Sequence, residues 1–431
     1  MAAGREPLPL QSGYLAEERH DKQNEFERSI VLSIKKVAVI GGGLMGYGIS
    51  QVAATAGHEV SLIDIRGDVL TKAMQKIEQS LEKLSAKKKI QESPELVLSR
   101  IHPTTSISEG VRDADCVIEA VFEDINLKRK VLGEADAHAP KHAIFATNTS
   151  GLSVTLIAEG TERREKVIGM HWMNPPQIMK LIEIIKSKYT DKETEQGVFD
   201  LCKIYKKELV LAQKDAWFFL AARARAGWSI ENNLMFLRKE AEVKELDATA
   251  KYTLGLPMGE FEIFDFTGAV DIRTKGLESV AQILETFPEF EPWPPLLVAY
   301  RRLADELWRP MSEKGLSGLK TGKGFYTYPD GKYVKPDIPK ELAGKVDPLQ
   351  LMAPAVNVAA WCVDHGIGSI EDVNKSFRLA FGWPKGIFEF VGDFGIENIL
   401  KTLSAKKEKA PDWLVDFYKP APLLENWEIS S

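Results

Sequence analysis

The amino-acid sequence predicts an α/β protein, in which a doubly wound sheet domain is followed by two all-α domains. From residue 34 to residue 213, short apolar runs alternate with helical segments. Such runs, bounded by turns, are typical of parallel strands that are covered on both faces. Beyond residue 213 helical periodicity dominates, and one motif occurs twice.

Length and composition limit the possible classes. At about 150 residues per domain, 431 residues predict two or three domains. The chain is 44% apolar and 27% charged, which excludes a disordered protein. Its 56 basic and 62 acidic side chains give a net charge of −6, which argues against nucleic-acid binding driven by global charge. Three scattered cysteines (Cys116, Cys202 and Cys362) suit neither a disulfide framework nor a Cys-rich metal site, so a reducing, cytoplasmic compartment is expected.

The amino-terminal segment differs from the rest of the chain. Residues 1–33 are polar and charged, and we expect a disordered or expression-related tail there. No signal-peptide pattern is visible at this end. The most apolar stretch, residues 37–56, is interrupted by five glycines, so no membrane-spanning helix is expected.

The sheet domain is expected over residues 34–213. Apolar runs predict strands at residues 37–40, 60–63, 116–121, 143–146, 167–170 and 181–185, with helices at 44–56 and 69–84. Helical periodicity follows at 230–252 and 294–307.

An internal repeat lies in the helical half. The segment Gly255-Leu-Pro-Met-Gly-Glu-Phe-Glu recurs from Gly382, and Gly268 pairs with Gly395 at the same offset, 395 − 268 = 127. Six identities at one offset predict two copies of a helical unit, at residues 214–335 and 336–431. The alternative is a coincidence of Pro-Gly turns.

A glycine motif points to a dinucleotide. Gly41, Gly43 and Gly46 form a G-x-G-x-x-G pattern between the first strand and the first helix, as in Rossmann-type domains. Asp64 ends the next strand, 64 − 46 = 18 residues later. A carboxylate there accepts hydrogen bonds from a ribose 2′-hydroxyl and repels a 2′-phosphate, which favours NAD over NADP. Arg66 lies close enough to weaken this preference.

Oxidation of an alcohol by hydride transfer also needs a base. Among seven histidines, His171 directly follows the strand expected at 167–170, at the edge where ligands bind in open α/β sheets. Glu183 lies between two isoleucines of the next strand, where a carboxylate is costly unless it is paired. We therefore predict that Glu183 orients the imidazole of His171. The alternatives are a structural histidine and a carboxylate exposed at a strand edge.

The chain resembles the L-3-hydroxyacyl-CoA dehydrogenase family from about residue 34 to residue 395. The motifs that carry this resemblance are the glycine loop, Ile118-Glu-Ala-Val-Phe-Glu-Asp124, Asn148-Thr-Ser150, Gly169-Met-His-Trp-Met-Asn-Pro175, Met179-Lys-Leu-Ile-Glu183 and Lys320-Thr-Gly-Lys-Gly-Phe-Tyr326. Both repeat units also resemble the helical domain of that family.

The resemblance implies reversible, NAD-dependent oxidation of a 3-hydroxyacyl-CoA in fatty-acid or short-chain acyl-CoA metabolism. The acyl-CoA would bind between the sheet domain and the helical domain, with His171 as base, Glu183 as its partner, and Ser150 and Asn174 holding the substrate oxygen. The implied NAD-binding residues are Gly41, Gly43, Leu44, Met45, Gly46, Asp64, Glu123, Lys128, Ser150, Asn174 and Lys320. For coenzyme A they are Ser80, Lys87 and Ser150, and the basic run at 87–89 suits a phosphate.

The resemblance also bears on partners. Two helical units occur in the larger multifunctional members, where the second copy takes the place of a partner subunit. The resemblance leaves three possibilities: the chain forms a homo-oligomer, it has a separate enoyl-CoA hydratase as its partner, or it is a member with dehydrogenase activity only.

One segment departs from the family pattern Lys-Asp-x-Pro-Gly-Phe-x-x-Asn-Arg. Residues 216–222 lack the Pro-Gly pair, and Ala222 replaces an active-site asparagine. Weakened activity and a short sequence error are both open explanations. The rival functions are a dinucleotide-binding protein with a structural or partner-binding role and an enzyme acting on a free hydroxy acid or sugar acid.

Overall fold

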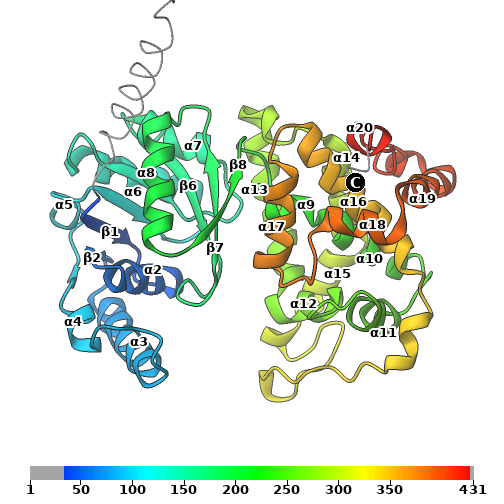
Figure 1. Cartoon of the computed structure of the whole chain (residues 1–431), viewed down its shortest axis with the longest axis horizontal. Helices are drawn as coiled ribbons and strands as arrows, with labels where there is room; N and C mark the ends of the chain where they lie inside the picture. Colours follow the sequence, from blue (N-terminus) through cyan, green and yellow to red (C-terminus); the bar gives the residue numbers. More distant parts are fainter. Residues whose placement is uncertain (1–33, 428–431) are drawn as a thin grey trace, which may run out of the picture.

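The computed structural model describes residues 34–427, so the tail expected at residues 1–33 lies outside the described residues. Figure 1 shows two lobes side by side: a sheet lobe, blue to green, and a helical lobe, green to red. Within residues 34–427, no helix has both the length and the apolar character needed to cross a membrane.

The sheet has eight strands in the order β3-β2-β1-β4-β5-β6-β7-β8. All neighbouring strands are parallel except β6 and β7, which are antiparallel. The sequence did not predict β3, an edge strand that contains a proline, or β8, the strand at the other edge. The strands are β1 (Lys36–Ile40), β2 (Glu59–Ile63), β3 (Ile101–Thr104), β4 (Cys116–Glu119), β5 (Ile144–Thr147), β6 (Val167–Trp172), β7 (Leu181–Lys186) and β8 (Glu208–Ala212).

Both faces of this sheet are buried. Val37 and Val39 of β1 belong to one apolar core, whereas Ala38 and Ile40 belong to another, because successive side chains of a strand point to opposite faces. This is the doubly wound arrangement that the apolar runs predict. The covering helices are α2 (Leu44–Thr55), α3 (Gly67–Ala86), α4 (Pro94–Leu98), α5 (Ile107–Gly110), α6 (Ile125–His138), α7 (Val154–Ala158) and α8 (Lys192–Ile204), with a 3-10 turn η1 (Arg164–Lys166).

The helical lobe begins after β8. The helix expected at 230–252 is divided in the structure: α10 ends at Leu237, and α11 begins at Val243. The α-helices are α9 (Ala221–Ala224), α10 (Ala226–Leu237), α11 (Val243–Ala248), α12 (Glu260–Thr267), α13 (Ala269–Thr286), α14 (Pro294–Leu303), α15 (Arg309–Glu313), α16 (Pro348–Asp364), α17 (Ile370–Ala380), α18 (Phe390–Phe394), α19 (Ile396–Lys409) and α20 (Pro422–Glu425). Short 3-10 or π turns are η2 (Thr249–Thr253), η3 (Pro288–Phe290), η4 (Ala304–Trp308), η5 (Leu319–Thr321), η6 (Pro329–Gly331), η7 (Lys340–Gly344), η8 (Ile387–Glu389) and η9 (Asp412–Leu414).

The two copies of the repeated motif contact each other reciprocally. Gly255 and Gly382 both adopt left-handed backbone conformations, with φ of 71° and 67°. A Cβ atom on Gly255 would lie 3.8 Å from Pro384, and one on Gly382 would lie 3.6 Å from Pro257. Each glycine therefore packs against the proline of the other copy.

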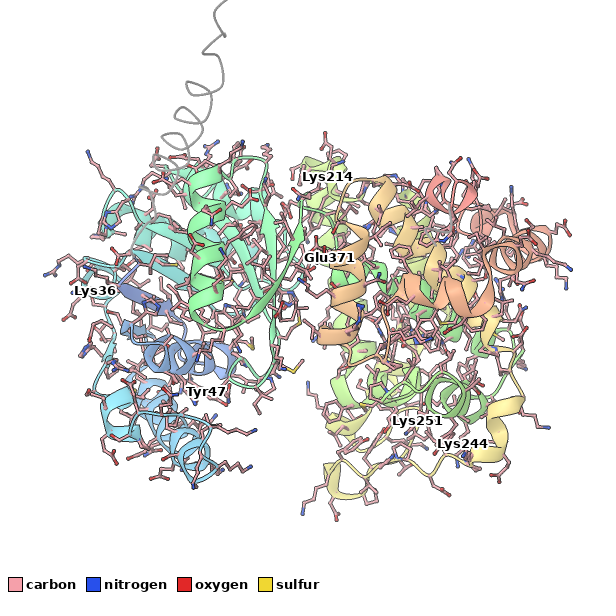
Figure 2. The ribbon with its side chains drawn as sticks, in the orientation of Figure 1. Lys36, Tyr47, Lys214, Lys244, Lys251 and Glu371 are labelled. Carbon is pink, nitrogen blue, oxygen red and sulfur yellow. The ribbon has the colours of Figure 1, made fainter. Side chains whose placement is uncertain are left out.

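The two lobes meet where the chain leaves β8. The Nζ atom of Lys214 donates a hydrogen bond of 2.6 Å to the carbonyl of His365 in the helical lobe. Figure 2 labels Lys214 beside α17, which carries Glu371. Helix α17 packs on β7 and β8, so the strand that carries Glu183 lies next to the helical lobe.

Candidate active site

His171 and Glu183 face each other on antiparallel strands. They are register partners of β6 and β7, and the Nδ1 atom of His171 lies 3.0 Å from Oε2 of Glu183. Strand β6 extends to Trp172, so His171 lies within the strand and not directly after it as the sequence predicted. The carboxylate is 1% exposed, which excludes the exposed strand-edge alternative.

The second oxygen of Glu183 fixes the proton arrangement. Oε1 accepts hydrogen bonds from the backbone amides of Leu220 (2.7 Å) and Ala221 (2.8 Å). Because an ionised carboxylate can only accept hydrogen bonds, Nδ1 of His171 must donate its proton to Oε2. The other ring nitrogen, Nε2, then keeps its lone pair. An imidazole in this tautomer can accept a proton from a substrate hydroxyl.

The glycine loop forms a cradle beside the start of α2. A Cβ atom on Gly46 would lie 1.6 Å from the carbonyl oxygen of Gly41, whereas one on Gly43 would meet no atom within 4 Å. Gly43 caps α2 without a side-chain hydrogen bond, so the first amides of the helix have no side-chain acceptor at the cap. Free amides beside an open backbone fit the pyrophosphate of a dinucleotide.

Asp64 lies at the same loop. Its carboxylate accepts hydrogen bonds from the amides of Gly42 (2.8 Å) and Arg66 (2.9 Å). The guanidinium of Arg66 is paired with Asp68 at 3.0 and 2.7 Å. From the sequence, Arg66 was a possible partner for the 2′-phosphate of NADP. In the structure Arg66 is paired with a carboxylate, so the geometry favours NAD over NADP.

Lys128 is buried under the cofactor loops. Its ammonium donates to both oxygens of Glu119, at 2.8 and 3.1 Å, and lies 3.4 Å from Oε2 of Glu123. Burial raises the pKa of the Glu119 carboxyl, and the neighbouring Lys128 opposes this shift. Oε1 of Glu123 accepts from the amides of Ser150 (2.8 Å) and Gly151 (3.1 Å). The geometry therefore makes Lys128 a support for Glu123, which is the more exposed of the two.

The other predicted residues lie in three places. Ser150 follows β5 and Asn174 follows β6, and both are exposed at the carboxyl edge of the sheet. Ser80 lies on α3 and Lys87 directly after it. Lys320 is exposed on η5 of the helical lobe.

The divergent segment 216–222 contributes to the site. Phe218 and Phe219 have positive φ of 66° and 52°, although neither is glycine. Trp217 stacks on Phe218 with ring centroids 4.1 Å apart, and the buried Phe219 ring lies 5.9 Å from the imidazole of His171. The sequence did not predict this contact or the two amides that bind Glu183. Ala222, directly beyond them, is exposed.

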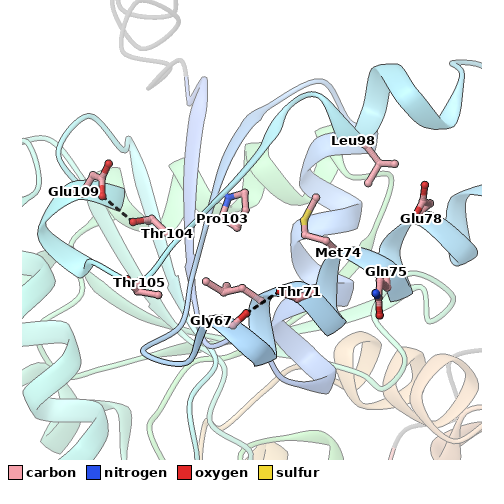
Figure 3. Close-up of a pocket in the computed structure, with 11 residues that line it drawn as sticks. Gly67, Thr71, Met74, Gln75, Glu78, Leu98, Pro103, Thr104, Thr105 and Glu109 are labelled. Atoms are coloured by element: carbon pink, nitrogen blue, oxygen red, sulfur yellow. Dashed lines mark hydrogen bonds between the residues drawn. The ribbon is translucent and has the colours of Figure 1, made fainter.

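A separate cavity of about 860 Å³ lies between α3 on one side and β3 with the segment that follows it on the other, as Figure 3 shows. Its lining includes Glu78 and Glu109 but no lysine or arginine, and none of the predicted site residues. Acidic side chains repel phosphate, so this cavity does not suit the phosphates of NAD or coenzyme A.

A dinucleotide cradle and a His–Glu dyad at one edge of a doubly wound sheet define an NAD-dependent dehydrogenase. Residues 36–216 match the NAD binding domain of 3-hydroxyacyl-CoA dehydrogenase, and residues 219–328 and 350–427 match its C-terminal domain. The chain therefore belongs to the 3-hydroxyacyl-CoA dehydrogenase family, whose members are oxidoreductases that act on 3-hydroxyacyl-CoA with NAD.

Individual relatives agree with this assignment. The mitochondrial hydroxyacyl-coenzyme A dehydrogenase of Mus musculus is 38% identical over 302 residues, which are 68% of this chain and 91% of that protein. The fatty acid oxidation complex subunit alpha of Shewanella sp. (strain MR-7) is 28% identical over 99% of this chain and 60% of that subunit. The structure of 3-hydroxybutyryl-CoA dehydrogenase from Escherichia coli K12 covers 91% of this chain and 98% of its own, with a TM-score of 0.76; at 24% identity it supports the fold alone.

Proposed function

We propose that His171 is the general base of a 3-hydroxyacyl-CoA dehydrogenase and that Glu183 is its orienting partner. The observation that carries this proposal is the 3.0 Å contact between Nδ1 of His171 and the buried carboxylate of Glu183. In the direction of oxidation, Nε2 of His171 takes the proton of the 3-hydroxyl group. Glu183 then stabilises the imidazolium that forms. Bound NAD⁺ supplies the acceptor for the hydride from C3.

The remaining residues bind and orient in this proposal. Ser150 and Asn174 hold the substrate oxygen against His171. The glycine loop, Asp64 and Glu123 hold the dinucleotide. Ser80 and Lys87 bind coenzyme A on the sheet lobe, and Lys320 reaches the cofactor from the helical lobe. We also propose that residues 214–335 and 336–431 are two copies of one helical unit, which the reciprocal Gly–Pro contacts support.

Steady-state turnover tests this function. The full chain is assayed for oxidation of NADH by acetoacetyl-CoA, and in parallel with short and long 3-hydroxyacyl-CoA substrates with NAD⁺ and NADP⁺. We expect turnover with NAD⁺ that His171→Ala largely removes, while NADH binding is nearly unchanged. An active His171→Ala protein would refute the role of the base. Competition by free coenzyme A separates this function from action on a free hydroxy acid.

The second candidate function is a dinucleotide-binding protein with weak or absent catalysis and a structural or partner-binding role. The exposed Ala222, at a position where the family pattern has an asparagine, favours it. Losing one preorganised hydrogen-bond donor costs about 10²–10³ in rate. Saturable NADH binding without turnover of acetoacetyl-CoA would support this function over the first.

Partners and compartment are also proposals. The match to the subunit of a fatty acid oxidation complex supports an assembly, either with an enoyl-CoA hydratase or with a second copy of this chain. Light scattering of the purified chain, alone and with a hydratase, distinguishes these assemblies. We propose a cytoplasmic location from the three free, buried cysteines, although the Mus musculus relative is named as mitochondrial. Fractionation of the source cell tests this location.

A further inference from the structure

The turn that joins β6 to β7, residues 173–180 (the connecting turn), links the two strands of the dyad. It carries Asn174, and it packs tightly on the cofactor helix α2. A Cβ atom on Gly48 of that helix would lie 2.8 Å from Oε1 of Gln177 and 3.0 Å from Cδ of Pro176. The position of the connecting turn therefore decides where Asn174 lies relative to the glycine loop.

Lys207 holds this turn from the segment between α8 and β8. Its ammonium donates hydrogen bonds of 2.6 Å to the carbonyls of both Pro176 and Met179. The same Nζ atom lies 5.8 Å from the centre of the Trp172 ring, directly after His171 in the chain. One cation thus contacts two points of the connecting turn and the end of β6.

The surroundings of Lys207 are unusual for a lysine. Burial lowers the pKa of Lys207 to about 8, and no carboxylate in residues 34–427 lies within 4.0 Å of its ammonium. The two carbonyls are therefore the hydrogen-bond acceptors that compensate the desolvation of the ammonium. Its neighbour Lys206 is exposed.

We infer that Lys207 is a positioning residue for the dehydrogenase reaction, which fixes the connecting turn so that Asn174 meets the substrate oxygen. This inference rests on the proposed function, because Asn174 has a role only if an acyl-CoA binds beside His171. Lys207 itself would touch neither substrate nor cofactor. A misplacement of about 1 Å in a substrate-holding group is enough to lower a rate by about 10²-fold.

The test compares Lys207→Met with Lys206→Met, its exposed neighbour, in the full chain. We expect Lys207→Met to lower kcat for acetoacetyl-CoA reduction by about 10-fold to 100-fold per NADH-binding site, with KM for NADH nearly unchanged. Lys206→Met should match the wild type. In an Asn174→Ala background, Lys207→Met should lower kcat by less than about 3-fold, because the two changes remove the same interaction.

Other outcomes overturn the inference. A merely structural lysine would lower the thermal midpoint while kcat per NADH-binding site stayed at the wild-type value. An undiminished effect in the Asn174→Ala background would show that Lys207 acts elsewhere. If Lys207→Met does not fold, Lys207→Gln, which keeps an NH₂ group but loses the positive charge, takes its place with the same criteria. A wild-type chain that binds NADH without turnover refutes the proposed function and this inference together, whereas equal kcat for the two lysine variants refutes the inference alone.

Discussion

Replacing Glu183 with glutamine exchanges one carboxylate oxygen of the His171–Glu183 dyad for an NH₂ group. Oε1 of Glu183 accepts two backbone amides, from Leu220 and Ala221. An amide nitrogen cannot accept those hydrogen bonds, and leaving both buried donors unpaired would cost about 1–3 kcal/mol each. The glutamine oxygen must therefore stay at this end, and its NH₂ group must face Nδ1 of His171.

This orientation forces the opposite tautomer on the imidazole. Nδ1 has to accept from the NH₂ group, so Nε2 carries the proton and cannot receive another from the substrate. The same carboxylate-to-amide change behind a catalytic histidine costs about 10⁴ in rate in the serine proteases. We expect Glu183→Gln to lower kcat by about 10³–10⁴, or about 4–5.5 kcal/mol in activation free energy.

The assay follows NADH absorbance during acetoacetyl-CoA reduction, and NADH fluorescence measures binding separately. The matched control is Glu59→Gln, because Glu59 contacts His102 at 2.9 Å on the same sheet but both side chains are exposed. We expect wild-type turnover for this control. Retention of more than about one tenth of kcat by Glu183→Gln would refute the tautomer argument. An Nδ1–H tautomer of His171 in the ¹⁵N spectrum of this variant would also refute it.

Two further predictions concern Ala222 and Asp247. If the exposed Ala222 position lacks a useful donor, Ala222→Asn should raise kcat by about 10-fold or more, and an unchanged kcat would show that the site does not need that amide. Burial raises the pKa of Asp247 to about 7, so its protonated form favours the folded state. The stability that it contributes is fully present below the unfolded pKa of about 3.9 and is lost as pH rises through about 7. Asn374 takes the equivalent place in the second repeat. In urea titrations, the unfolding free energy of Asp247→Asn should therefore rise relative to that of the wild type between about pH 4 and about pH 7, and the difference should level off above that range. A difference that does not vary with pH would contradict this reasoning.

Local patterns determined much of this protein. The β1–β2 segment, the glycine loop and the position of Asp64 were predictable. Apolar runs and glycines indicate the local backbone conformation, which depends on only a few neighbouring residues. The pairing of Glu183 with His171 was also predictable, because a buried carboxylate between isoleucines needs a partner.

Tertiary structure decided the rest. Only the antiparallel pairing of β6 with β7 sets His171 directly opposite Glu183. The second oxygen of Glu183 is held by the amides of residues 220 and 221, about forty positions along the chain, and backbone amides leave no mark in a sequence. Lys128 and Lys207 look like ordinary charged residues in the sequence, and only packing buries the first completely and the second in part. The physical reason is that the hydrogen-bond partners and the burial of a side chain depend on which segments contact each other, and those contacts are determined by the fold as a whole.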